Sequence, residues 1–246
     1  MPKKIISRTS PTPPVRAKSS SLPPKPTNVL IYGFTYAFAV LSFIWSQLLY
    51  SDLTVNPRKN LEAGIPVLVV IQLLYCVFGH LEDNWKLSQP GRAKKLSEPS
   101  IRRNLLGAIL SVILSLALSL YVYILLFLFG APLSEGVVET LLCAVHISLL
   151  SVQPLIFVYK LDSKIWKDVV SIKLPLDGLN GAATGTWLGA WLGAVPIPLD
   201  WDRPWQQWPI TIVVGAYCGA VIGTMVGCIA QRLRAHGLIG ASNPGN

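Results

Sequence analysis

Charged residues are scarce in this chain of 246 residues: aspartate, glutamate, lysine and arginine together make up 13% of it. A soluble globular domain carries about 25% charged residues. Hydrophobic residues account for 52% of the sequence and are gathered in long blocks. The composition therefore excludes an ordinary water-soluble domain and predicts an integral membrane protein with one domain.

Residues that hold metals or form disulfides are also few, with three histidines and four cysteines. The cysteines show neither metal-ligand spacing nor a disulfide framework, and all lie inside apolar blocks: Cys76, Cys143, Cys218 and Cys228. We interpret them as small packing residues. Basic residues outnumber acidic residues, which gives a net charge of +9. The basic residues lie between apolar blocks and form no stripe or groove, which argues against a nucleic-acid partner.

Six stretches are long and apolar enough for a helix to cross a bilayer, which takes about 20 residues. They cover residues 28–50, 61–80, 104–130, 136–159, 179–195 and 209–231. The fifth stretch is short and rich in glycine, so it is the weakest of the six. The sequence predicts an all-α membrane protein, a bundle of six transmembrane helices over residues 28–231.

Lysine and arginine are unevenly divided among the connections between these stretches. Of the 21 cationic residues, 18 fall in the two tails and in the second and fourth connections; the exceptions are Arg58, Lys59 and Arg203. The positive-inside rule then predicts that both termini are cytosolic. Residues 1–27 are rich in Pro, Ser and Lys and lack the apolar core of a signal peptide, so they are predicted to be a disordered cytosolic tail. Residues 232–246 form a second, short tail.

Two rows of glycines at a spacing of four stand on either side of one short loop. They are Gly181, Gly185, Gly189 and Gly193 before it, and Gly215, Gly219, Gly223 and Gly227 after it. Residues four apart lie on nearly one face of a helix, so each row forms a groove without side chains that another helix can approach closely. The rows serve either an internal hairpin or a partner subunit. A milder row, Gly107, Ser111, Ser115 and Ser119, raises the number to three, so we expect some partner contact.

The loop between the rows, VPIPLDWDRPWQQWP, combines aromatic, charged and proline residues. Its tryptophans suit the headgroup level of a membrane, where amphipathic rings anchor: Trp201, Trp205 and Trp208. Its charges lie beside them: Asp200, Asp202 and Arg203. Two interpretations stay open. The loop is an interfacial turn with an internal Asp–Arg pair, or a stiff platform that contacts a lipid headgroup or a lumenal domain.

A polar line runs through the fourth stretch, where Glu139, His146 and Gln153 are spaced by seven and share a helix face. Such residues in a span face the bundle interior or a cavity. They form either an interhelical hydrogen-bonding face or a path for a proton or a headgroup. Glu139 lies near the predicted lumenal end and is the best candidate for a contact outside the bundle.

Two strings resemble the PIG-F family of glycosylphosphatidylinositol (GPI) anchor biosynthesis. One is GAWLGAVPIPLDWDRPWQQWPI, Gly189 to Ile210, and the other is FGAPL, Phe129 to Leu133, followed by Glu139 and Thr140. The resemblance implies a multi-pass protein of the endoplasmic reticulum membrane. It implies a non-catalytic subunit that stabilises large multispan GPI ethanolamine phosphate transferases, which move phosphoethanolamine from phosphatidylethanolamine to a mannose of the GPI precursor.

The sequence itself holds little that could perform this transfer. The predicted lumenal loops contain no histidine or cysteine, and their acids are scattered: Asp52, Glu135, Asp200 and Asp202. A phosphotransferase of this kind needs metal ligands and a nucleophile. A second cluster, His80, Glu82 and Asp83, lies on the predicted cytosolic side and is interpreted as a solvated helix end. We expect no catalytic residue, metal or cofactor in this chain.

Two other functions stay open. A lipid or small-solute carrier would use the polar line as its path, although carriers often show internal repeats with broken helices. A lipid-binding helper would hold phosphatidylethanolamine or the GPI precursor near Asp200, Asp202 and Arg203. Together with the transferase chain, these lipids are the partners that we expect.

Overall fold

The structure is a computed structural model that describes residues 26–50, 53–79, 99–132, 136–171, 173–199 and 203–238. Within these ranges the chain is helical, with turns between the helices and no strand. The long helices are α1 (Pro26–Tyr50), α2 (Pro57–Gly79), α4 (Pro99–Leu128) and α9 (Ile210–Ala235). The shorter elements are α5 (Val137–Ile147), the π-helical turn η1 (Ser148–Val152), α6 (Gln153–Tyr159), α7 (Ser163–Val170), α8 (Gly178–Ala194) and the 3₁₀ turn η2 (Pro204–Gln206).

Five helices of the described part are long and apolar enough to cross a membrane: α1, α2, α4, α9, and α5 to α6 taken as one. This confirms the predicted all-helical architecture of a multi-pass membrane protein. The helix α8 has 17 residues and falls short of that length. Its crossing, and with it the predicted count of six and the orientation of the termini, therefore stays a prediction.

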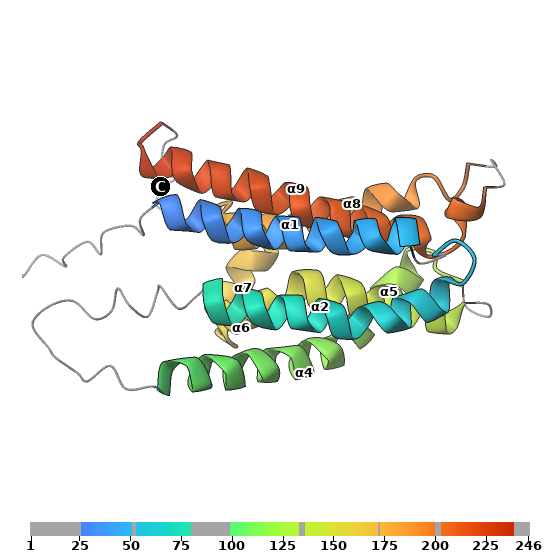
Figure 1. Ribbon diagram of the computed structural model, residues 1–246, viewed down its shortest axis with the longest axis horizontal. Helices are drawn as coiled ribbons and strands as arrows, with labels where there is room; N and C mark the ends of the chain where they lie inside the picture. The colour runs from blue at the N-terminus through green and yellow to red at the C-terminus, as the bar shows by residue number, and fades with distance from the viewer. Residues whose placement is uncertain are drawn as a thin grey trace, which may run out of the picture.

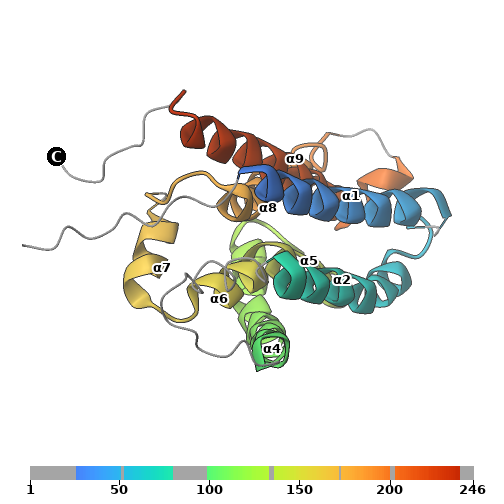
Figure 2. The ribbon, with the colours of Figure 1, turned by 60° about the vertical axis from the view of Figure 1, so that its left-hand side comes forward.

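The long helices lie side by side along the long axis of the molecule (Figure 1). Helix α1 lies against α9, and α2 lies against α5. Figure 2 looks almost along α4 while α1, α2 and α9 run across the view, so α4 crosses them obliquely. The first turn of α1 and the last turn of α9 lie at the same end of the bundle (Figure 1).

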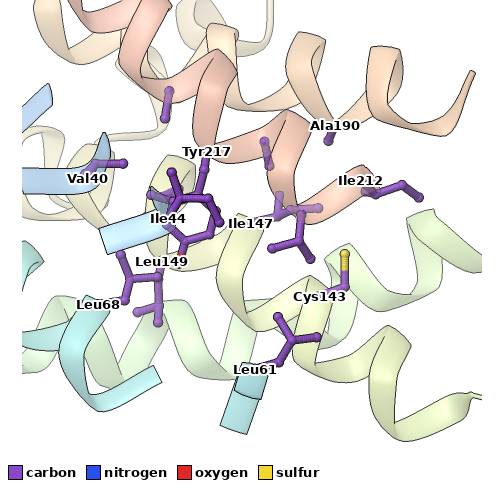
Figure 3. Packing of buried hydrophobic residues seen from close by; sticks show 14 of the residues in the cluster. Val40, Ile44, Leu61, Leu68, Cys143, Ile147, Leu149, Ala190, Ile212 and Tyr217 are labelled. Carbon is purple, nitrogen blue, oxygen red and sulfur yellow. The ribbon is translucent and has the colours of Figure 1, made fainter. Parts of the chain in front are cut away.

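The segment from α5 to α6 forms the centre of the bundle and is the most deeply buried of the long segments. At this centre, Val40, Leu68, Ile147, Leu149 and Tyr217 meet from five different elements (Figure 3). In lipid, such contacts gain little from the hydrophobic effect, since the lipid tails are as apolar as the side chains. Close packing and hydrogen bonds between helices must hold the bundle together.

The π-helical turn η1 frees a backbone acceptor at the centre of the bundle. The backbone N–H of Gln153 donates to Ser148, five residues back, and not to Leu149 as an α-helix would require. The carbonyl oxygen of Leu149 instead accepts from the side-chain amide of Gln72 on α2, at 2.8 Å. Pro154, which has no N–H, follows directly, so the wide turn also accommodates this break in the hydrogen-bond ladder.

Helix α7 occupies residues that the sequence analysis treated as part of a loop. Asp162 caps its first turn by accepting a hydrogen bond from the N–H of Lys164 at 2.9 Å. The indole N–H of Trp166 donates to the carbonyl of Lys160 at 2.8 Å, which folds α7 back on the end of α6. Lys164 and Lys167 are exposed, while Trp166 and Val169 pack against the buried residues of α6 and α8. The short helix is thus amphipathic and lies beside the end of α6 (Figure 2).

Candidate functional site

The two glycine rows lie against each other in the hairpin of α8 and α9, which make the most extensive contact between any two helices described. A Cβ atom on Gly219 would lie 2.8 Å from the carbonyl carbon of Gly185. A Cβ on Gly189 would lie 2.8 Å from that of Gly215. Non-bonded carbon atoms prefer 3.5–4.0 Å. Backbone therefore meets backbone along this glycine seam, and no side chain of any size fits between the helices.

An apolar groove of about 760 Å³ follows one side of the glycine seam. Its floor contains glycines of both rows, and its walls carry exposed side chains of α8 and α9: Leu188, Leu192, Ile222 and Val226. Trp205 and Pro196 line the end near the connection between the two helices. The same rows thus pack on each other and leave an apolar surface open.

The opposite side of the hairpin faces the bundle. Thr186, Ala190, Ala216, Tyr217 and Ala220 are buried there. Small residues predominate among these, so the hairpin can approach η1 and α5, while the ring of Tyr217 reaches in among the buried residues of the other helices (Figure 3). The hairpin accordingly has one face committed to this chain and one face that the described residues leave uncovered.

The charged loop is described only in part, since Asp200, Trp201 and Asp202 lie outside the described residues. Arg203 is exposed at the start of η2, where its backbone N–H donates to the side chain of Gln206 at 3.0 Å. The amide of Gln206 in turn donates to the carbonyl of Pro196 at 2.8 Å. These bonds tie the two ends of the loop together, so the loop holds Trp205 at the mouth of the groove.

Trp208 joins the loop to another helix. Its indole N–H donates to the hydroxyl oxygen of Thr140 in the first turn of α5, at 2.8 Å. That hydroxyl donates to the carbonyl of Gly136, also at 2.8 Å. The beginning of α9 is therefore fixed to the beginning of α5, and both of the family-like strings meet at this end of the bundle.

Glu139 lies beside this junction and is half-buried in the first turn of α5. It faces the beginning of α2 across a pocket that also contains Arg58 and Lys59. The sequence analysis noted these two cations only as exceptions to the charge pattern. Their significance comes from a contact between segments far apart in the chain.

His146 and Gln153, the other members of the polar line, are fully buried and bind neighbouring helices. The carbonyl oxygen of Leu61 can only accept, so its contact with His146 Nε2 at 3.1 Å places the proton on Nε2. His146 Nδ1 then accepts from the hydroxyl of Tyr217 at 2.7 Å. Gln153 donates to the hydroxyl of Ser111 on α4 at 2.9 Å.

The structure thus gives both residues the interhelical role, one of the two interpretations that the sequence left open. Gln72 and Tyr217 complete this network and were missed. An amide or a hydroxyl inside an apolar span is the signal that could have identified them.

No group of three His, Cys, Asp or Glu residues that could hold a metal ion gathers within the described ranges. Of the acids considered above, Asp52 and Glu135 lie outside those ranges, as do His80, Glu82 and Asp83. The described residues present three features: an apolar groove beside the glycine seam, a tied loop at the end of that groove, and a charged pocket where α2 and α5 begin.

Comparison with known proteins identifies the family of this chain. The model of the GPI biosynthesis protein family Pig-F matches residues 35–228. The chain belongs to that family. A family member from Yarrowia lipolytica named glycosylphosphatidylinositol anchor biosynthesis protein 11 is 41% identical over 216 residues, which cover 87% of this chain and 89% of the relative. The Pyricularia oryzae protein of the same name is 34% identical, covering 92% and 87%.

One Pig-F relative is joined to an enzyme. In Schizosaccharomyces pombe, a protein named PIGF/3-ketodihydrosphingosine reductase fusion protein is 31% identical over 211 residues, which cover 85% of this chain and 39% of the relative. No solved structure matches the chain.

Proposed function

We propose that this chain is a non-catalytic subunit of a GPI ethanolamine phosphate transferase in the endoplasmic reticulum membrane. It stabilises a large multispan catalytic chain, which transfers phosphoethanolamine from phosphatidylethanolamine to a mannose of the GPI precursor. Membership of the Pig-F family and the names of the relatives support a role in GPI anchor biosynthesis. In this proposal α8 makes the sixth crossing, and both termini are cytosolic.

The apolar groove beside the glycine seam is the observation that carries the proposal. Small residues in a membrane helix let another helix approach closely, and the resulting van der Waals contact stabilises the pair. One face of the hairpin is already used within the bundle, while the groove stays open among the described residues. A transmembrane helix of the catalytic chain is the occupant that we propose.

The loop at the end of the groove would make the second contact. Trp205 lines this end of the groove, Arg203 precedes it in the loop, and Trp208 fixes the loop to α5. Asp200, Trp201, Asp202 and Glu139 complete the interface that we predict with the catalytic chain or a lipid. On the proposed orientation these residues face the lumen, where the transfer takes place.

The alternative of a lipid or solute carrier has less support. A carrier would need the polar line as its path, yet His146 and Gln153 are both engaged in hydrogen bonds between helices. No observation in the described part of the chain gives this alternative comparable weight.

The test fills the groove without disturbing the seam. Ile222→Trp and Leu188→Trp each place a bulky ring on an exposed wall of the groove, and Leu110→Trp does the same on the exposed face of α4 as a matched control. Each variant is captured from cells in mild detergent, and co-purified transferase chains are identified and quantified by mass spectrometry at equal expression.

We expect about tenfold less transferase with the two groove variants, equivalent to about 1.4 kcal/mol, and an unchanged amount with the control. Equal recovery with all three variants would show that the catalytic chain docks elsewhere. Absence of any transferase with the unaltered protein would contradict the subunit role itself.

A further inference from the structure

A charged pocket of about 380 Å³ lies where α2 and α5 begin, and its lining shares no residue with that of the groove. Its polar lining consists of Asn56, Arg58, Lys59, Glu62 and Glu139. The pocket brings two cations and two carboxylates together at one end of an otherwise apolar bundle. Its volume lies within the range of small-ligand pockets, about 300–1,000 Å³.

The charges in this pocket are only partly satisfied by one another. Arg58 Nε donates to Glu62 at 3.0 Å, one helical turn further along α2. Glu139 and Lys59 form no ion pair within 4.0 Å among the described residues. The guanidinium of Arg58 keeps further N–H donors that this pair does not use. Free cationic donors therefore face a free carboxylate across the pocket.

The position of Glu139 is fixed by its helix. It lies in the first turn of α5, where the positive end of the helix dipole favours a carboxylate. The next residue, Thr140, is held by the indole of Trp208. The backbone that carries the carboxylate is thus held by its own helix and by the bond of Trp208 to the next residue.

An apolar face continues from the charges along α2. Arg58 and Glu62 are followed at the same spacing of four by Pro66, Val70 and Leu74. These three residues are exposed, with Val70 and Leu74 about half accessible. A helical turn holds 3.6 residues, so each step of four moves about 40° around the helix, and this strip winds around α2 as it leaves the charges. A ligand with a charged head and flexible apolar tails would match both parts of this strip.

We infer that the pocket binds the zwitterionic headgroup of a phospholipid that carries a primary ammonium group, with its acyl chains along α2. Arg58 and Lys59 would donate to the phosphate, for which a guanidinium is well suited. Glu139 would accept from the ammonium group, which has three N–H donors. The beginning of α2 and of α5 is the depth at which headgroups meet helices that cross a membrane.

Other ligands fit the same charges less well. A purely anionic phospholipid, or inorganic phosphate, would leave the carboxylate of Glu139 without a partner. A quaternary ammonium group is typically held by aromatic faces, and none of the described residues that line the pocket is aromatic. The balance of two cations against two acids thus favours a zwitterion with N–H donors.

This inference stands on the pocket alone and does not require the subunit role proposed above. Its test therefore uses the purified full chain without any partner. Delipidated protein in detergent is titrated with phosphatidylethanolamine, phosphatidylcholine or phosphatidic acid carrying the same acyl chains, and binding is read by native mass spectrometry. A null result would leave the proposed transferase contact untouched.

We expect phosphatidylethanolamine to bind about tenfold more tightly than phosphatidylcholine, the size of one charge-assisted hydrogen bond. Glu139→Gln should abolish this preference, and Lys59→Met should weaken all three lipids. Asp168→Asn and Lys167→Met make the same chemical changes on exposed or half-exposed positions of α7 and should leave binding unchanged. Glu139→Asp keeps the carboxylate and should keep a preference for phosphatidylethanolamine.

Three outcomes would overturn the inference. The three lipids could bind equally well, or a folded Glu139→Gln variant could retain the full preference. Inorganic phosphate could also displace the lipid as effectively as soluble phosphoethanolamine, which would reveal a simple anion site. Thermal unfolding of each variant in the same detergent establishes that a loss of binding is not a loss of fold.

Discussion

The hairpin of α8 and α9 and the group formed by α2, α4 and α5–α6 hold their helices together in opposite ways. In the hairpin, glycines bring backbone against backbone, and no side chain lies between the helices. In the other group, buried polar side chains reach across to a neighbour: Gln72 to Leu149, Ser148 to Ser115 and Gln153 to Ser111. Both arrangements replace the hydrophobic driving force that helices lack inside a bilayer.

The difference predicts two kinds of sensitivity. The glycine seam depends on volume, so it should be destroyed by one added side chain whatever its chemistry. The packing of α2, α4 and α5–α6 depends on hydrogen-bond donors and acceptors. Its stability should tolerate changes of side-chain volume at the edge and should fall when one partner of a hydrogen bond is removed. His146 and Tyr217 connect the two, since this pair joins α5 to the buried side of the hairpin.

The largest effect is expected from Gly219→Val, which would break the seam. Its Cβ alone would lie 2.8 Å from the carbonyl carbon of Gly185, so the helices must separate. We expect a loss of about 3 kcal/mol or more in the free energy of unfolding, above the usual range for overpacking because the obstacle is backbone. Denaturant unfolding in mild detergent, followed by circular dichroism, measures this loss.

Gly107→Ala is the matched control for the seam. Its Cβ would lie 3.6 Å from the ring of Phe157, an ordinary contact, and alanine favours a helix over glycine. This variant should be as stable as the parent or slightly more stable. Similar losses for both glycines would show that the hairpin is no more sensitive to added volume than α4.

A smaller effect is expected from Tyr217→Phe, which removes one hydroxyl and leaves Nδ1 of His146 without a donor. A buried acceptor that loses its partner costs about 1–3 kcal/mol, and hydrogen bonds within membranes often fall at the low end. A double-mutant cycle with His146→Phe, measured by the same unfolding experiment, isolates the coupling between the two helices. Additive effects would mean that the 2.7 Å contact contributes no coupling.

The smallest effect concerns the cap of α8. The carboxylate of Asp177 accepts from the N–H of Asn180 at 2.7 Å, while burial raises the pKa of Asp177 above its usual 3.8 in spite of nearby Arg234. A raised pKa means that the folded protein disfavours the charged form of Asp177. The contribution of this carboxyl group to the free energy of unfolding is therefore largest at low pH, and it declines as the pH rises from about 3.8 through the raised value.

Asp177→Asn keeps a capping oxygen and removes the charge, so its stability at neutral pH should equal or exceed that of the parent by a few tenths of a kcal/mol. Asp177→Ala should lose about 1 kcal/mol. Melting temperatures recorded across this pH range compare the three proteins. A parent that becomes more stable as the pH rises through this window would contradict the assigned direction of the pKa.

The helices were predictable where the signal is local. The predicted stretch 179–195 differs from α8 by one residue at each end. The agreement is close because the glycine spacing and the capping residue Asp177 are local features of the sequence. The turn η1 was not predictable, since its extra residue serves the contact of Leu149 with Gln72 on another helix. Helix α7 is too short for its periodicity to stand out, although Asp162 was a possible start signal.

The candidate site shows the same division. The loop and the glycine rows are contiguous, so the sequence alone suggested them. The charged pocket is different, because Arg58 and Lys59 meet Glu139 only through the packing of α2 against α5. Glu139 was singled out for an external contact, but its cationic neighbours could not be paired with it from one sequence.

The glycine seam also restricts how this protein can evolve. At most packed interfaces, a residue that becomes larger can be compensated by a smaller one opposite it. Here the atom nearest to an added Cβ is, for each glycine of the two rows, a backbone carbonyl oxygen, which every amino acid carries. In several cases the residue that carries this oxygen is itself a glycine. No second substitution on the facing helix can restore the fit, so each of these positions must remain glycine unless the whole hairpin shifts.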